Sequence, residues 1–183
     1  MVEVLTIKTA SLKVCIFGDT RVGKTSLIQR FLINRFLEDT KATIGVDIFT
    51  TDLELENYNI KLQVWDVAGA PKFKVFMPIY AKGSSGGIFM YDLTRKQSFD
   101  NLAQWISLFQ KNLVVQSQAI PILGVGGKKD LSNQRIVHIN TENCNNSINS
   151  IYDFMECSAK TGENVQKIFK SLTNEILTTR GFI

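Results

Sequence analysis

The chain has 183 residues, of which 44% are hydrophobic and 21% are charged, which is typical of a soluble globular protein of one domain. Its formal net charge is only +4, and Lys and Arg are scattered along the chain rather than gathered in a stripe. This pattern argues against a nucleic-acid partner, and we expect residues 1–183 to form a single domain that works as a monomer.

The first predicted elements are a strand, a helix and a strand pair. The short apolar run 12–17 precedes a glycine, as a buried strand often does, and 25–35 has apolar residues at helical spacing. Residues 44–55 and 60–65 alternate between apolar and polar like strands, with turn-forming residues between them. The sequence therefore predicts an antiparallel hairpin after the first helix.

The middle of the chain continues the alternation of strands and helices. Residues 88–91 and 120–125 are short apolar runs that predict buried strands. Between them, Ser98 is expected to cap the start of a helix. The apolar face of that helix would comprise Phe99, Leu102, Ile106, Phe109 and Leu113.

The last third of the chain predicts one more strand and one more long helix. Residues 140–150 are rich in asparagine and predict a weak surface helix, 151–155 predict a strand, and 164–177 predict an amphipathic helix. Strands that alternate with helices predict an α/β fold, whose sheet binds ligands at the carboxyl ends of its strands. We therefore expect the chemistry in the loops that follow Phe17, Trp65, Val125 and Met155.

Cysteine and histidine usage argues against two kinds of site. Cys15, Cys144 and Cys157 have no metal-ligand spacing, and His138 is the single histidine, so we expect neither a disulfide framework nor a His/Cys metal site. No apolar window is long enough to span a bilayer, and the last residues lack the cysteine that a prenyl anchor needs. We expect a cytoplasmic protein with no prenyl anchor in this chain, peripheral at membranes only if a lipidated tail lies outside it.

A complete phosphate-loop pattern follows the first predicted strand and opens the first predicted helix. The pattern G-x-x-x-x-G-K-[ST] is matched by Gly18, Asp19, Thr20, Arg21, Val22, Gly23, Lys24 and Thr25. Backbone N–H groups of such a loop close around phosphate oxygens, and the helix N-terminus adds partial positive charge. Lys24 is expected to contact the outer phosphates and the Thr25 hydroxyl to bind Mg²⁺, with Ser26 beside them. A plain glycine turn is the alternative, and the loop alone does not choose the base.

Beyond this loop, the chain resembles the Ras superfamily from about residue 12 to 177, and within it a Rab. The Rab-like stretches are 43–47, 61–66 and 91–94. The resemblance implies a three-layer α/β fold of the P-loop small-GTPase type, with a six-stranded, mostly parallel sheet, one antiparallel edge hairpin, and helices on both faces. It also implies GTP and GDP as ligands and Mg²⁺ as cofactor.

The resemblance assigns roles on the phosphate side of the site. Thr43 would close on Mg²⁺ and the γ-phosphate, Asp66 would hold Mg²⁺, and the Gly69 N–H would bind the γ-phosphate. With Thr25, this gives Mg²⁺ the oxygen ligands that a hard cation prefers. Phe36 would either pack edge-on against guanine or be a core residue at the end of the first helix.

The resemblance also assigns the base contacts. Residues 128–130 match the last three positions of the family's N-K-x-D motif. Asp130 would accept hydrogen bonds from the guanine N1–H and amine, which adenine cannot offer, and the methylenes of Lys128 would cover the ring. Ser158, Ala159 and Lys160 match the second base loop, in which the Ala159 N–H would meet guanine O6.

Two positions depart from the family pattern. Ala70 stands where the family has the glutamine that orients the attacking water, and Pro71 beside it removes an N–H donor and restricts the backbone. Gly127 stands where the base motif opens with an asparagine that bonds the base and braces the phosphate loop. Loss of that group costs roughly 1–3 kcal/mol, so we expect weakened guanine affinity. The catalytic positions would be Lys24, Thr43, Gly69 and Ala70.

The leading interpretation is a slow GTPase that acts as a nucleotide switch in membrane trafficking or signalling. Its switch loops, 39–48 and 68–82, would bind effectors and regulators, aided by an exposed strand-pair face that carries Phe49 and Trp65, although Trp65 could equally be a core residue. A pseudo-GTPase that serves as an interaction module is the alternative, favoured by Ala70 and Gly127. An ATP-dependent enzyme on the same loop is a third reading, which the guanine-type base motifs oppose.

Overall fold

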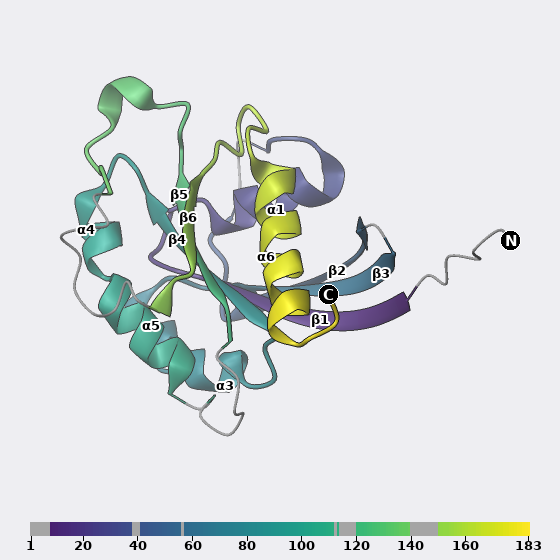
Figure 1. The fold of residues 1–183 in the computed structure, drawn as a ribbon. Coiled ribbons are helices and arrows are strands. Elements are labelled where there is room, and N and C mark those ends of the chain that lie inside the picture. Colours follow the sequence, from purple (N-terminus) through teal and green to yellow (C-terminus); the bar gives the residue numbers. More distant parts are fainter. Residues whose placement is uncertain (1–7, 38–40, 56, 112, 114–119, 140–149) are drawn as a thin grey trace, which may run out of the picture.

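The computed structural model describes residues 8–37, 41–55, 57–111, 113, 120–139 and 150–183. Within these residues, strands and helices alternate as the sequence predicts (Figure 1). In chain order the elements are β1 (Lys8–Phe17), α1 (Lys24–Ile33), β2 (Val46–Leu55), β3 (Tyr58–Val67), α2 (Pro71–Lys74), α3 (Met77–Ala81), β4 (Gly86–Asp92), α4 (Lys96–Asp100), α5 (Leu102–Gln110), β5 (Ile122–Gly127), the 3₁₀ turn η1 (Ser132–Gln134), β6 (Asp153–Glu156) and α6 (Val165–Thr179).

The six strands form one sheet in the order β2-β3-β1-β4-β5-β6. The pairs β1–β3, β1–β4, β4–β5 and β5–β6 are parallel, and β2–β3 is antiparallel. This confirms the predicted six-stranded, mostly parallel sheet with one antiparallel hairpin at its edge. The parallel strands all end at the same edge of the sheet, so the loops that follow them lie near one another.

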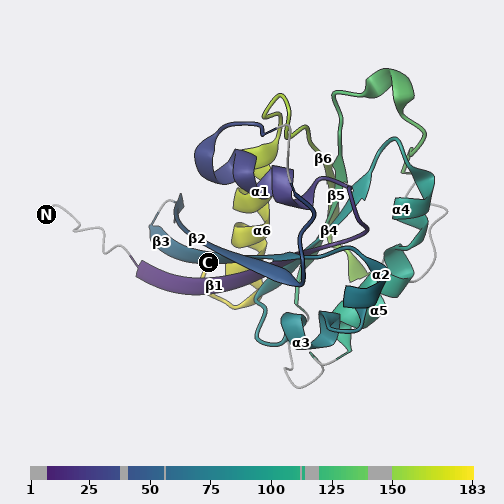
Figure 2. The same cartoon turned by 180° about the vertical axis from the view of Figure 1, so that it is seen from behind.

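Helices cover both faces of the sheet and bury a separate apolar core on each. Figures 1 and 2 show α1 and α6 on one face, and α3, α4 and α5 on the other. The stacked rings of Phe31 and Phe169 join α1 to α6 at 3.8 Å between centroids. On the opposite face, Phe109 of α5 stacks on Phe17 of β1 at 4.8 Å. No helix in the described part of the chain is long and apolar enough to cross a membrane.

The segment after β4 differs from its prediction. Ser98 lies inside α4, and its hydroxyl accepts the Asp92 N–H at 2.9 Å and donates to the Arg95 carbonyl at 2.6 Å. It therefore joins the helix to the end of β4, and the expectation that it caps the helix start was wrong. The single helix expected here is two helices, α4 and α5, and Asn101 lies between them. The predicted surface helix at 140–150 lies, except for its last residue, outside the described residues.

Candidate functional site

The phosphate loop is closed by two glycines that no other residue could replace without strain. Gly18 has a φ of 139° and Gly23 a φ of 106°, both in the region that side chains disfavour. A Cβ on Gly18 would lie 2.0 Å from the Met90 carbonyl oxygen, so the loop rests directly on the end of β4. The glycine pattern seen in the sequence thus reflects a tight turn pressed against the sheet.

Lys24 is a buried cation at the centre of this loop. Its side-chain nitrogen donates to the carbonyl oxygens of Gly18 at 2.9 Å and Asp19 at 2.7 Å, and the residue is only 6% exposed. Burial lowers the pKa of Lys24 to about 8, although the carboxylates of Asp66 and Asp19 oppose this shift. The fold therefore holds a desolvated ammonium group where the sequence predicts a phosphate contact.

Thr25, Thr43 and Asp66 converge beside Lys24. The Thr25 hydroxyl donates to Asp66 Oδ2 at 2.5 Å and lies 3.0 Å from the Thr43 hydroxyl, which is itself 3.2 Å from Asp66 Oδ2. Asp66 is fully buried, and burial raises its pKa, whereas the Thr25 hydrogen bond and the charge of Lys24 lower it. The predicted Mg²⁺ ligands therefore meet at one point although they come from three separate segments.

This cluster fits a magnesium ion. The second carboxylate oxygen, Asp66 Oδ1, is buried and has no hydrogen-bond partner among the described residues. Such an orphaned anionic oxygen is costly unless a cation or a donor reaches it. The remaining groups are hydroxyl oxygens, which suit Mg²⁺. Among the described residues no cluster of three or more His, Cys, Asp or Glu suited to a metal occurs.

Gly69 brings the segment after β3 against the phosphate loop. A Cβ at this position would lie 2.3 Å from the Asp19 carbonyl carbon and 2.4 Å from the Thr20 nitrogen, so only glycine fits. Ala70 follows in extended backbone conformation, is half-buried, and presents only a methyl group. Pro71 is the first residue of α2, a position where a helix leaves the N–H unpaired in any case, so its missing donor matters less than the sequence suggests.

A network around Asp19 was missed by the sequence analysis. Its carboxylate accepts the Asn101 amide at 2.7 Å and the Trp105 indole N–H at 2.9 Å, and Lys74 Nζ lies 3.5 Å away. Lys74 also lies 4.8 Å from the centroid of the Trp105 ring. These contacts join α2 to α5, and Figure 2 shows α2 lying beside α5. These partners are distant in sequence and follow no local motif, so no pattern pointed to them.

The base-side residues surround a hollow of about 330 Å³. Its lining comprises Val22, Gly23, Ser26, Phe36, Met90, Lys128, Asp130, Leu131, Ala159 and Lys160. The predicted base contacts therefore meet in one place, together with Met90, which the sequence analysis did not single out. Phe36 is half-buried, lies beyond the end of α1, and belongs to neither apolar core, which favours the nucleotide role over the core role.

Hydrogen bonds and an ion pair fix the two base loops, residues 128–130 and 158–160. The Ser158 hydroxyl donates to Asp130 Oδ1 at 2.6 Å, which fixes the exposed carboxylate. Lys128 has a φ of 65°, and its ammonium group lies 2.7 Å from Asp92 Oδ2, which extends its methylenes along the hollow. Arg30 Nε donates to the Ala159 carbonyl at 2.6 Å. Ser158 thus acts by positioning Asp130, and Asp92 and Arg30 are supporting residues that the sequence analysis missed.

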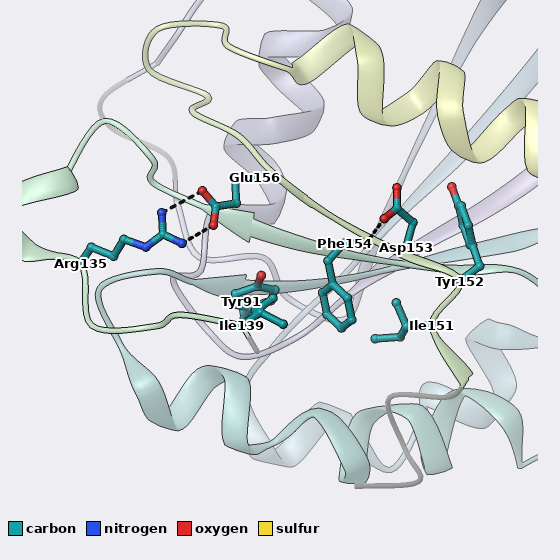
Figure 3. Close-up of a pocket in the computed structure, with 8 residues that line it drawn as sticks. All are labelled: Tyr91, Arg135, Ile139, Ile151, Tyr152, Asp153, Phe154 and Glu156. Atoms are coloured by element: carbon teal, nitrogen blue, oxygen red, sulfur yellow. Dashed lines mark hydrogen bonds and ion pairs between the residues drawn. The ribbon is translucent and has the colours of Figure 1, made fainter. Parts of the chain in front are cut away.

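A second hollow of about 470 Å³ lies against β6 (Figure 3). Its lining includes Tyr91, the Arg135–Glu156 ion pair and Phe154. Ile139 and Ile151 also line it.

The strand-pair face predicted to carry both Phe49 and Trp65 does not exist. Phe49 is opposite Val64 in the antiparallel register and packs on the core beneath α1 and α6, whereas Trp65 packs against the other core. The two side chains therefore lie on opposite faces. Trp65 is half-buried under the ammonium group of Lys13, 3.5 Å from the ring centroid, and its cross-strand partner is Ile48, which is 54% exposed.

Comparisons with known proteins identify the family of the chain. A model of the Ras family matches residues 13–178. The Ras-related protein Rab-11C of Dictyostelium discoideum is 38% identical over 164 residues, which cover 90% of this chain and 71% of that protein. The GTP-binding protein ypt3 of Schizosaccharomyces pombe is 34% identical over 164 residues, covering 90% of this chain and 75% of its own length. The chain belongs to the Ras family of small GTPases and is Rab-like.

Proposed function

We propose that this chain is a guanine-nucleotide-binding switch that binds GTP and GDP with Mg²⁺, hydrolyses GTP slowly, and acts in membrane trafficking through protein effectors. The observation that carries the proposal is the meeting of Thr25, Thr43 and Asp66 beside the buried ammonium group of Lys24. A buried cation and an orphaned carboxylate oxygen side by side suit a metal-bound polyphosphate. The trafficking role is what the resemblance to Rab proteins implies.

Each of these residues would have a separate role in phosphoryl transfer. Lys24 would donate to the outer phosphate oxygens, and the Gly69 N–H and Thr43 would contact the γ-phosphate. Thr25, Thr43 and Asp66 would hold Mg²⁺, which would supply charge neutralisation at those oxygens. The methyl group of Ala70 has no atom that could orient the attacking water. Charge stabilisation is therefore retained while water positioning is lost.

Effectors would recognise the exposed apolar side chains on the two switch segments. Ile44 is 80% exposed, Val75 is 69% exposed and Ile79 is 64% exposed. Apolar side chains exposed together on segments that respond to the nucleotide would offer a partner surface that changes with the bound state. Ile48, rather than Phe49, would extend this surface onto the sheet.

The pseudo-GTPase remains the second candidate function, because Ala70 and Gly127 both depart from the family pattern. Chromatography of the nucleotide that the purified, denatured protein releases separates the candidates. We expect GTP or a mixture rich in GTP, since slow hydrolysis would leave the substrate bound. GDP alone would indicate a working GTPase, adenine nucleotides an ATP-dependent enzyme, and no nucleotide a pseudo-enzyme.

Asp130→Asn should change base choice without disturbing the phosphate contacts. The substituted amide cannot accept from both guanine donors, but it can donate to the second carbonyl of xanthine. We expect GDP affinity to fall at least about tenfold and xanthosine diphosphate affinity to rise, measured by competition. Ser158→Ala, which removes the hydrogen bond to the same carboxylate, serves as a control. It should weaken GDP binding without raising the affinity for xanthosine diphosphate.

Asp66→Asn should remove the dependence of nucleotide binding on Mg²⁺. In the unmodified chain, chelation by EDTA should speed the release of a fluorescent GDP analogue at least about tenfold, because the phosphates lose their counter-charge. Asp66→Asn should release it rapidly with or without EDTA. Asp47→Asn is the matched control, since Asp47 lies directly across the hairpin from Asp66 and is exposed. An unchanged EDTA response in Asp66→Asn would contradict the metal assignment.

A further inference from the structure

Met90 lies at the junction of the phosphate loop and the base hollow. It is 1% exposed and comes from β4, and it lines the hollow that contains Asp130 and Ala159. Its terminal methyl group lies 3.3 Å from where a Cβ on Gly23 would stand. The unbranched side chain thus runs from the sheet to the underside of the phosphate loop.

The same methyl group occupies the space in front of Gly127. A Cβ on Gly127 would lie 2.7 Å from the methyl carbon of Met90 and 2.9 Å from the Val22 carbonyl oxygen. The backbone at Gly127 is outside the left-handed region, so packing rather than conformation excludes a side chain there. Gly127 is therefore not an open gap that a restored asparagine would simply fill, as the sequence alone suggests.

This packing changes which atoms of a bound guanine can be recognised. On the proposed assignment, the Asp130 carboxylate accepts hydrogen bonds from the guanine N1–H and amine, and the Ala159 N–H donates a hydrogen bond to O6. The acceptor next to O6 on the same base edge is N7. Met90 forms part of the remaining wall of the hollow, and its thioether has no hydrogen to donate.

We propose that Met90 and Gly127 are coupled by packing and close the base pocket with an apolar wall. This chain would therefore bind guanine without a hydrogen bond to N7. The inference about base reading rests on the proposed guanine-nucleotide function, whereas the packing of the pair does not. Met90 is on this account a specificity-determining residue, and Gly127 is the glycine that the length of Met90 and the Val22 carbonyl oxygen together require.

The packing is tested without nucleotide, by urea unfolding of the single and double variants. Gly127→Asn alone should lower the unfolding midpoint, because the new side chain collides with Met90 and the Val22 carbonyl. Met90→Val alone should lower it by leaving a cavity. The double variant should be more stable than the sum of the two changes predicts. Met77→Val, in the core on the opposite face, combined with Gly127→Asn, should be additive.

The base reading is tested by comparing GDP with 7-deaza-GDP, which has a C–H in place of N7. The unmodified chain should bind the two within about twofold of each other. The double variant, which holds an amide donor in a pocket freed of the methionine methyl, should bind GDP about ten to a hundred times more tightly than it binds 7-deaza-GDP. Gly127→Asn alone should gain no GDP affinity.

The outcomes distinguish the packing of Met90 against Gly127 from the recognition of guanine N7. Additive stabilities in the Met90–Gly127 cycle would overturn the coupled pair whatever the nucleotide data show. A tenfold preference of the unmodified chain for GDP over 7-deaza-GDP would overturn the claim that N7 is unread. If no variant binds GDP while the stability coupling holds, the guanine-nucleotide function and the base reading fail together and the packing inference stands.

Discussion

Lys24→Ala is expected to abolish nucleotide binding while leaving the fold intact. The ammonium group is the cation enclosed by the phosphate loop, and its charge-assisted bonds to phosphate would be lost, so GDP affinity should fall at least about a hundredfold. The lowered pKa of Lys24, caused by burial, means that the ligand-free fold gains little from this charge. The ligand-free protein should therefore unfold at a similar urea concentration with or without Lys24.

Isothermal titration with GDP and Mg²⁺, paired with urea unfolding, checks both halves of this expectation. Lys61→Ala is the control, since Lys61 is exposed on β3, away from the loop. Unchanged GDP affinity in Lys24→Ala would show that the loop does not hold phosphate. Loss of affinity together with unfolding would mean that Lys24 supports the fold rather than the ligand.

Ala70→Gln is expected to raise single-turnover GTP hydrolysis at least about tenfold, because a side-chain amide can orient the attacking water whereas a methyl group cannot. Gly69 already presses this segment against the phosphate loop, so the new side chain starts from the right backbone position. The unmodified chain should retain only the charge stabilisation that Lys24 and Mg²⁺ supply, and its GTP form should be long-lived.

Ala70→Met is the matched control, since methionine has nearly the length of glutamine but no group that orients water. It should hydrolyse GTP at the rate of the unmodified chain. If the unmodified chain already matches Ala70→Gln, then Ala70 does not limit catalysis. If none of the three hydrolyses GTP, the limit lies elsewhere in the site or in a missing partner, and the pseudo-GTPase gains support. An activating protein that inserts its own glutamine would be the natural source of the missing group.

The order of elements and the phosphate loop could be predicted from the sequence because their causes are local. Apolar runs of strand length, helical spacing of apolar residues, and glycines at fixed intervals each express a backbone requirement within a few neighbouring residues. Gly18 and Gly23 illustrate this, since both adopt the positive φ that their pattern implies. The exact ends of strands were less predictable, because polar residues such as Lys8 extend β1 by pairing with β3.

Contacts between segments distant in the sequence could not be predicted. Asp19 meets Asn101 and Trp105 only because α5 packs over the end of β1, and no motif records that approach. The faces of Phe49 and Trp65 were likewise set by the register of the hairpin, in which a shift of one residue exchanges the two sides.

The sequence by itself determined that this chain is a P-loop protein of the Ras type, and it predicted which residues would carry its chemistry. Only the tertiary structure decided how Gly127 is to be understood. As a motif position it is a missing asparagine, but in three dimensions the methyl group of Met90, 37 residues earlier, already fills the space in front of it. A motif records which side chain is absent, whereas close packing across the sheet determines whether its absence leaves a gap.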